Sequence, residues 1–161
     1  MARRALSGPL VLLGLGACGA APAPAGAPAA EDRAEVIAAV ESLFAGMRSR
    51  DLEMLAEVLL PTASIFRIDV ESGETETATV ADLLAAVETA PEPLNEAMWE
   101  PEVRVDGPLA MLWAPYGFHR GATFSHWGYD AFHLVREGES WRIVAIAYTR
   151  RFEPMRVRTG R

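Results

Sequence analysis

The feature that most constrains the fold is an alternation of polar and apolar residues that begins near Glu96 and continues through the second half of the chain. Alternation with a period of two is typical of strands that bury one face of a sheet. Gly121 and Gly138 lie in short loops between the longest alternating segments, and loops of this length join antiparallel neighbours. The pattern predicts three long strands in a meander: Leu109–Phe118, Thr123–Val135 and Trp141–Phe152.

The first half of the domain shows helical spacing instead. An apolar stripe at intervals of three and four residues predicts a first helix that carries Val36, Ile37, Val40, Leu43, Phe44 and Met47. Asp32 and Glu35 precede this stripe with the spacing of a capping box. Two further helices are predicted, over Asp51–Leu60 and from Thr79 to the residue before Pro91.

Two shorter strands complete the expected pattern. Thr62–Val70 is predicted as a strand that ends at a Ser72-Gly73 turn. Trp99–Val105 is predicted as a strand that Pro101 interrupts, because proline cannot donate to a sheet ladder. Helices followed mainly by an antiparallel meander predict one α+β domain over residues 31–153.

The chain begins with the pattern of an exported lipoprotein. Arg3 and Arg4 precede a short apolar run, Leu6–Leu15, whereas a permanent span needs roughly 20 apolar residues. The run ends in Leu15-Gly16-Ala17-Cys18, which resembles a bacterial lipobox, and Cys18 is the only cysteine of the chain. We therefore expect a signal peptide over residues 1–17 and acylation of Cys18; a plain signal peptide and an uncleaved anchor are the alternatives.

A lipid-anchored protein of the bacterial cell envelope, on the periplasmic side, follows from this interpretation. Residues 18–30 are rich in alanine, proline and glycine and are predicted to be an extended spacer. Residues 154–161 are predicted to be a basic tail. Gly19 is not the acidic residue that retains some lipoproteins in the inner membrane, which favours the outer membrane.

Composition excludes several functions. The formal net charge is −7, and an acidic protein repels phosphate backbones, so nucleic acid is not an expected partner. The three histidines are not spaced with other ligands as in a metal site. Neither a glycine-rich phosphate loop nor a nucleophile elbow is present, and no cofactor is expected.

Four segments resemble a known superfamily: Leu112–Phe118, Phe124–Phe132, Trp141–Val144 and Tyr148–Arg151. With the order of helices and strands, they are similar to the nuclear transport factor 2-like, or SnoaL-like, superfamily and to its lumazine-binding branch. The resemblance spans about residues 31–151. It implies a cone-like curved antiparallel sheet that wraps around the N-terminal helices and leaves a pocket open at one end. The superfamily contains isomerases, dehydratases, epoxide hydrolases, cyclases and non-catalytic binders, so it implies no single activity.

The candidate catalytic residues are Asp130, His126 and Tyr116. Asp130 and His126 share one face of their strand, but four residues on a strand span about 13 Å. A hairpin centred on Gly121 would place Tyr116 opposite His126. In a catalytic interpretation Asp130 is the base, His126 an acid or base, and Tyr116 a donor to an oxyanion, as in dehydratases of the superfamily. In the alternative they are buried polar groups that only stabilise the sheet. The predicted pocket also includes Trp113, Phe132 and Thr149.

The strand register predicts the surroundings of the candidate carboxylate. Pairing of Glu137 with Ser140 across the last hairpin would place Asp130 opposite Ala147, so that small residues surround the carboxylate. The other face would then be an apolar patch of Tyr129, Tyr148, Ala131 and Ile146. Such a patch is too apolar to face water, which predicts a homodimer through this face of the sheet.

These patterns favour a membrane-anchored protein that binds a small apolar or aromatic molecule in a cone-shaped pocket. The alternative is a dehydratase- or isomerase-like enzyme that uses general acid/base chemistry in the same pocket. A third possibility is an interaction module whose cone is filled by side chains. Arg67 and Asp69, near the expected pocket mouth, are interpreted as a solvated ion pair.

Overall fold

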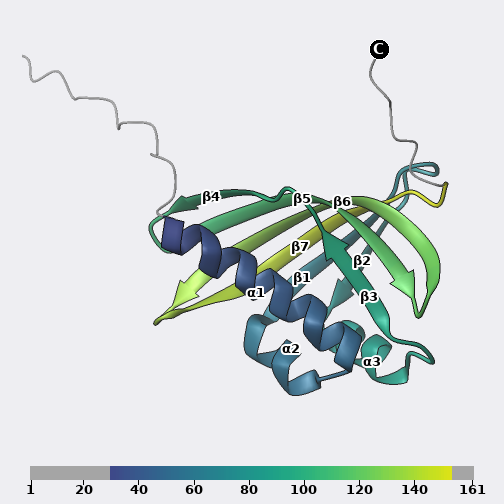
Figure 1. Ribbon diagram of the computed structural model, residues 1–161, viewed down its shortest axis with the longest axis horizontal. Helices are drawn as coiled ribbons and strands as arrows, with labels where there is room; N and C mark the ends of the chain where they lie inside the picture. Colours follow the sequence, from purple (N-terminus) through teal and green to yellow (C-terminus); the bar gives the residue numbers. More distant parts are fainter. Residues whose placement is uncertain (1–29, 154–161) are drawn as a thin grey trace, which may run out of the picture.

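A curved sheet lies over three helices in the computed structural model, which describes residues 30–153. The helices are α1 (Ala30–Ser49), α2 (Leu52–Val58) and α3 (Val80–Thr89). Figure 1 shows α1 running along the concave side of the sheet, with α2 and α3 at one end of it. The helices therefore cover one side of the sheet only.

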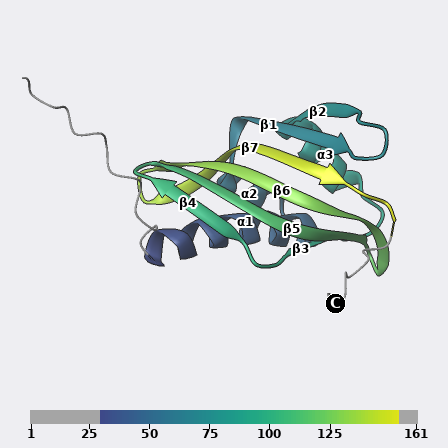
Figure 2. The same cartoon turned by 90° about the horizontal axis from the view of Figure 1, so that it is seen from above.

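The sheet has the order β2-β1-β7-β6-β5-β3, and β4 pairs with the remaining length of β5. Figure 2 shows β3 and β4 following one another along β5 at one edge of the sheet, with β2 at the opposite edge. The predicted α+β class with a curved sheet is confirmed, and the pairing of β1 with β7 is parallel, so the sheet is mixed. The strands are β1 (Leu59–Asp69), β2 (Thr75–Thr79), β3 (Leu94–Met98), β4 (Glu102–Asp106), β5 (Leu109–Arg120), β6 (Thr123–Glu137) and β7 (Ser140–Arg150).

The apolar stripe of α1 forms the centre of the core. Val36 and Val40 are fully buried, and Leu43, Phe44 and Met47 are nearly so. The Phe44 ring meets the edge of the Phe132 ring from β6, with centroids 6.1 Å apart. Burial of this stripe removes several large side chains from water, at about 1.5–3 kcal/mol each, and holds α1 against the sheet.

The predicted capping box at Asp32 and Glu35 is wrong. The helix begins at Ala30, so both residues lie inside its first turns rather than at its cap. Their carboxylates accept hydrogen bonds from Arg136 at the end of β6, and the Glu35 contact is 2.9 Å. The Arg136 guanidinium also lies 4.7 Å from the centre of the Trp141 ring. These acidic residues therefore connect α1 to the sheet instead of capping the helix.

The other two helix starts follow the sequence closely. Asp51 caps α2 by accepting a hydrogen bond from the Met54 amide, and Thr79 with Asp82 forms a complete capping box at α3. The helix predicted over Asp51–Leu60 is too long at its C-terminal end, because Leu59 already belongs to β1. The turn at Gly73 is present, but strand β2 after it was not predicted.

Of the strand predicted over Trp99–Val105, only the part after Pro101 is a strand. β4 begins at Glu102, whereas residues 99–101 form a break after β3, a strand that ends at Met98 and was not predicted. Glu100 in the break has a φ of 49°, a left-handed conformation that turns the chain between the two strands. The break allows both short strands to pair in sequence with the single long strand β5.

The convex face of the sheet carries a different patch from the one predicted. Ile146 is buried beneath the sheet, and Tyr148 also points to the concave side. The exposed large side chains on the convex face include Phe66, Trp113 and Tyr129, of which Trp113 and Tyr129 stack with centroids 5.3 Å apart. Dimerisation through this face stays a prediction.

The signal peptide, Cys18, nearly all of the spacer and the basic tail lie outside the described residues. Within residues 30–153, each helix is too short or too polar to cross a membrane.

Candidate functional site

Rows of side chains across the concave face build the site. Arg67 on β1 pairs with Tyr148 on β7, which pairs with Asp130 on β6, which pairs with Ala114 on β5. Directly paired residues point to the same face of a sheet, so all four face the helices. The small side chain of Ala114 leaves space beside the Asp130 carboxyl group.

A register shift between His133 and Leu134 produces this row. The pairing of Glu137 with Ser140 is as predicted, but beyond the shift Asp130 lies opposite Tyr148 and not Ala147. A shift of one residue exchanges the faces of the strand. The surroundings of Asp130 are consequently aromatic and polar, rather than the small residues expected.

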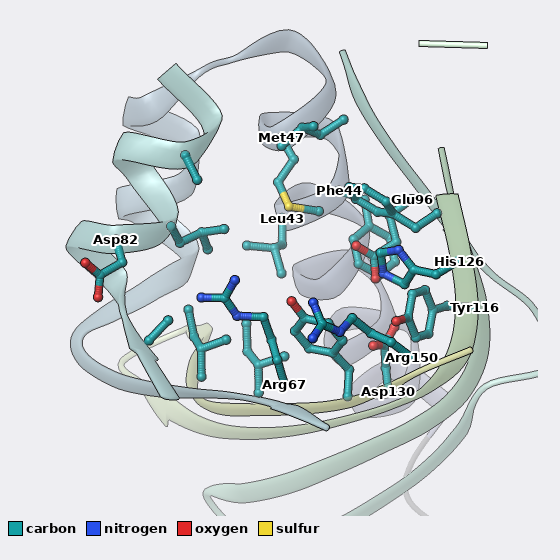
Figure 3. Close-up of a pocket in the computed structure, with 18 of the residues that line it drawn as sticks. Leu43, Phe44, Met47, Arg67, Asp82, Glu96, Tyr116, His126, Asp130 and Arg150 are labelled. Carbon is teal, nitrogen blue, oxygen red and sulfur yellow. The ribbon is translucent and has the colours of Figure 1, made fainter. Parts of the chain in front are cut away.

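The rows enclose a cavity of about 180 Å³ between the sheet, α1 and α3 (Figure 3). Asp82, Ala86 and Arg120 are exposed and form its rim. Tyr116 and Asp130 are almost fully buried and form its floor. Most of the remaining wall is apolar: Leu43, Phe44, Met47, Ile65, Ala78, Leu83, Leu94, Phe118 and Ile146.

Two carboxyl groups meet at the floor of the cavity. Asp130 on β6 and Glu96 on β3 both line the cavity, and the Asp130 Oδ2 atom is buried without a hydrogen-bond partner among the described residues. Burial raises the pKa of Glu96 to about 7. Burial, followed by the charge of Glu96, raises the pKa of Asp130 well above its ordinary value. Two adjacent buried carboxylates do not both ionise readily, so the pair holds a shared proton near neutral pH.

Tyr116 lies on the same face as both candidate partners, but its predicted position opposite His126 is wrong. It pairs with Gly128, halfway between His126 and Asp130, because the β5–β6 hairpin is irregular near its turn. The Tyr116 hydroxyl donates a hydrogen bond of 2.9 Å to the carbonyl oxygen of Thr149. Burial raises the pKa of Tyr116, so the hydroxyl keeps its proton and remains a donor.

Gly128 makes this contact possible. A Cβ atom at Gly128 would lie 1.8 Å from the Thr149 carbonyl oxygen, so only glycine leaves room for it. The Tyr129 amide, one residue on, donates to the Thr149 side-chain hydroxyl at 2.9 Å. The Thr149 carbonyl oxygen thus accepts the hydrogen bond of the Tyr116 hydroxyl, and the Thr149 hydroxyl accepts that of the Tyr129 amide in β6.

His126 is neutral in this environment. Its ring stacks on Phe118 with centroids 4.8 Å apart and meets the edge of Tyr116, and Nδ1 is 3.0 Å from the Ser125 hydroxyl. Burial, followed by the charges of Arg150 and Arg120, lowers the pKa of His126 to about 4. At neutral pH the imidazole would offer a ligand one donor and one acceptor nitrogen rather than a positive charge.

The structure brings Tyr116, His126 and Asp130 together in one cavity wall and leaves out the other three residues assigned to the pocket. Trp113 and Thr149 fall on the convex side of the register, where Trp113 is 40% exposed. Phe132 points to the concave face, as predicted, but it is covered by α1, packs against Phe44 and does not line the cavity. Strand parity and helix coverage, not residue type, place these three residues outside this cavity.

The predicted site lacked several cavity residues with polar side chains, among them Glu96, Tyr148, Arg67 and Arg150. Arg67 does not pair with Asp69 as expected; its Nε atom is 3.7 Å from a Glu76 oxygen, while Asp69 accepts backbone hydrogen bonds in the following turn. Burial raises the pKa of Tyr148 to about 12. Among residues 30–153, no three histidine, cysteine or acidic side chains are grouped as metal ligands.

Substitution of Gly128 by alanine should destabilise the protein. The added methyl group collides with backbone at Thr149 and displaces the Tyr116 hydrogen bond, so we expect a loss of about 2–4 kcal/mol in the free energy of unfolding. Gly117→Ala is the matched control, because its Cβ would meet only the Trp99 ring at 3.8 Å. Equal stabilities of the two variants in urea denaturation would contradict this account.

The carboxyl pair should make stability fall as pH rises from about 4.5 to about 7. In this interval the folded protein holds a proton on Glu96 that the unfolded chain has lost, so the slope is negative. Glu96→Gln should reduce that slope and raise the free energy of unfolding at pH 8 by about 1–3 kcal/mol.

His126 contributes in the opposite sense, since its lowered pKa costs stability as pH falls from about 6.5 to about 4. Denaturation at each pH gives the difference in free energy of unfolding between Glu96→Gln and the unaltered chain. This difference contains the contribution of the carboxyl pair and not that of His126. Glu102→Gln, at an exposed position on β4, serves as control. A pH-independent difference would rule out the shared proton.

Comparison with known proteins supports the fold. Residues 31–149 match the protein family described as "Putative lumazine-binding". No curated protein matches the chain significantly.

Several solved structures are similar to this chain in fold. An NTF2-like protein of unknown function from Silicibacter pomeroyi is 24% identical, with a TM-score of 0.60 over 75% of this chain and 97% of that one. One from Shewanella baltica is 16% identical, with a TM-score of 0.58 over 75% and 94%. A protein from Streptomyces avermitilis described as "a putative dehydratase from the NTF2-like family" is 12% identical, with a TM-score of 0.61 over 76% and 98%.

Sequence identities this low show only that the folds are similar, whereas the family match covers most of the chain. Together with the curved sheet over α1, they identify the architecture as nuclear transport factor 2-like. The chain therefore belongs to the family described as "Putative lumazine-binding".

Proposed function

We propose that the protein binds a small, largely apolar molecule in the cavity between α1, α3 and the sheet. The observation that carries this proposal is a cavity with a largely apolar wall whose floor holds a buried carboxyl oxygen, Asp130 Oδ2, without a hydrogen-bond partner among the described residues. Buried polar groups that lack partners cost about 1–3 kcal/mol each, so they are retained where a ligand satisfies them. Cavities of this composition are the usual form of small-molecule sites.

The volume limits the size of the ligand. A cavity of about 150 Å³ in another protein accommodates a benzene molecule, so about 180 Å³ suits a body of roughly one ring. A hydroxyl or carbonyl group on that body would reach the shared proton of Glu96 and Asp130. The protonated pair donates one hydrogen bond and accepts others, which suits a neutral polar group at the floor.

Filling the rim should weaken binding. Ala85 and Ala86 on α3 are both exposed, but Ala86 lines the cavity and Ala85 does not. We expect Ala86→Leu to weaken binding of single-ring compounds such as indole or phenol at least tenfold, and Ala85→Leu to leave it unchanged. Isothermal titration with each protein makes the comparison. Equal weakening in both variants would refute binding in this cavity.

We also propose that acylated Cys18 anchors the protein to a bacterial membrane, with the domain on the periplasmic side and the outer membrane favoured. The support is the sequence Leu15-Gly16-Ala17-Cys18 after a short apolar run, with no other cysteine in the chain. Cells fed a radioactive fatty acid should label the unaltered protein and not the Cys18→Ser variant. Label retained in the variant would overturn the anchor.

A second candidate function is proton transfer on a bound substrate, as in a dehydratase or isomerase. The observation in its favour is the raised pKa of Glu96, to about 7, with Asp130 also on the cavity floor. A base works best when its pKa is near the working pH. Tyr148, beside Asp130 and still protonated at neutral pH, would be the donor to a developing oxyanion, since the Tyr116 hydroxyl already binds Thr149.

Exchange of carbon-bound hydrogen provides the test of this second candidate. In heavy water, the protein should exchange the α-hydrogens of single-ring ketones such as cyclohexanone faster than buffer does. Glu96→Gln should reduce the rate at least a hundredfold, while Glu102→Gln should not change it. Proton NMR follows the exchange. Identical rates for the unaltered protein and the Glu96→Gln variant would rule out this candidate.

A further inference from the structure

Two arginine side chains enter the cavity from neighbouring strands. Arg67 on β1 and Arg150 on β7 lie two residues apart in the register of the parallel pair, with Arg67 opposite Tyr148 and Arg150 opposite Asp69. Figure 3 shows both guanidinium groups pointing into the cavity. Their positive charge acts on the other cavity groups, since Arg150 lowers the pKa of His126 and opposes the rise in that of Tyr148.

The contacts of these arginines leave donors free. The Nε atoms of Arg67 and Arg150 are both buried without a hydrogen-bond partner among the described residues. A single carboxylate faces them: one oxygen of Glu76 lies 3.7 Å from Arg67 Nε and 3.8 Å from Arg150 Nη2, beyond hydrogen-bond distance. A ligand with acceptor oxygen atoms would stabilise these buried N–H groups by forming the hydrogen bonds that they lack.

The other nearby carboxylates are committed elsewhere. Asp82 accepts hydrogen bonds from the Thr79 amide and hydroxyl, at 2.8 and 2.7 Å, as the cap of α3. Asp69 accepts from the amides of Glu71 and Ser72 in the turn after β1.

The positive charge of the cavity is concentrated in these two side chains. Among the described residues, Glu76 alone has a carboxylate oxygen within 4 Å of either guanidinium group, while Asp69 and Asp82 act on Arg150 and Arg67 at longer range. A planar carboxylate carries one charge and presents two oxygens to guanidinium donors.

We propose that Arg67 and Arg150 bind the carboxylate of the ligand, and that the ligand class is a small organic carboxylic acid with a body of about one ring. This inference rests on the proposed function, because it names the chemistry of the molecule bound in the same cavity. The apolar body lies along the wall formed by Leu43, Met47 and Leu83. A hydroxyl or carbonyl substituent reaches the carboxyl pair on the floor.

The test compares matched probes on the full chain. Benzoate and benzamide have nearly the same shape and differ in charge, as do cyclohexanecarboxylate and its amide. Isothermal titration should give each carboxylate at least tenfold tighter binding than its amide. Inorganic phosphate, titrated alone, should bind at least tenfold more weakly than benzoate.

Charge-removing variants locate the binding group. Arg67→Gln and Arg150→Gln should each weaken benzoate at least tenfold and leave benzamide unchanged. Arg104→Gln, at an exposed arginine on β4 outside the cavity, should change neither probe. The probe comparison on the unaltered chain stands even where a variant fails to fold.

The outcomes separate the two proposals. Equal binding of acids and amides would overturn the proposal that the ligand is a carboxylate, while leaving the proposal of small-molecule binding intact. So would preferential binding of phosphate, or an acid affinity that survives both arginine substitutions. Failure of every ring compound, acid or amide, would overturn the proposed function and this inference together.

Discussion

The packing of α1 against only part of the concave face is the contact on which the rest of the structure depends. Val40 and Phe44 pack against the part of the face that contains Phe132, and core side chains fill this part. Asp130 and His126 line the cavity beside it, where Leu43, Phe44 and Met47 of the same stripe form one wall. A curved sheet with one helix in its hollow is thus divided into a packed region and a cavity.

The buried polar groups of the cavity cost less stability than isolated charges would, because their shifted pKa values favour uncharged forms. His126 is neutral, and Glu96 with Asp130 shares a proton, so the cost of burying isolated charges is largely avoided. The arginines differ, since guanidinium groups stay charged, and they lie nearer the rim, with side chains 36% and 21% exposed for Arg67 and Arg150. The cavity therefore carries reduced charge at its floor and positive charge toward its opening, which gives a ligand a defined orientation.

Local patterns in the sequence predicted the elements well, and the site less well. The three long strands and the capping box at Thr79 depend on near neighbours, and all are present. The position of Tyr148 depends on a one-residue shift between His133 and Leu134, which no local pattern indicates. Glu96 was missed because β3 is short, yet Leu94, Glu96 and Met98 alternate on one face, an acid between two apolar residues. That pattern was the available signal for a buried carboxyl group.

The Thr149 contacts have a consequence for motion at the cavity floor. Here β6 and β7 are held in part by a threonine hydroxyl, which binds the Tyr129 amide, while the neighbouring carbonyl is turned to Tyr116. A side-chain hydroxyl can rotate without moving the backbone of either strand, whereas a ladder carbonyl cannot. The ladder between β6 and β7 is therefore interrupted between its flanking pairs, Trp127 with Arg151 and Asp130 with Tyr148, and local opening would be confined to this stretch. A molecule bound at the floor would press on this stretch and not on paired backbone.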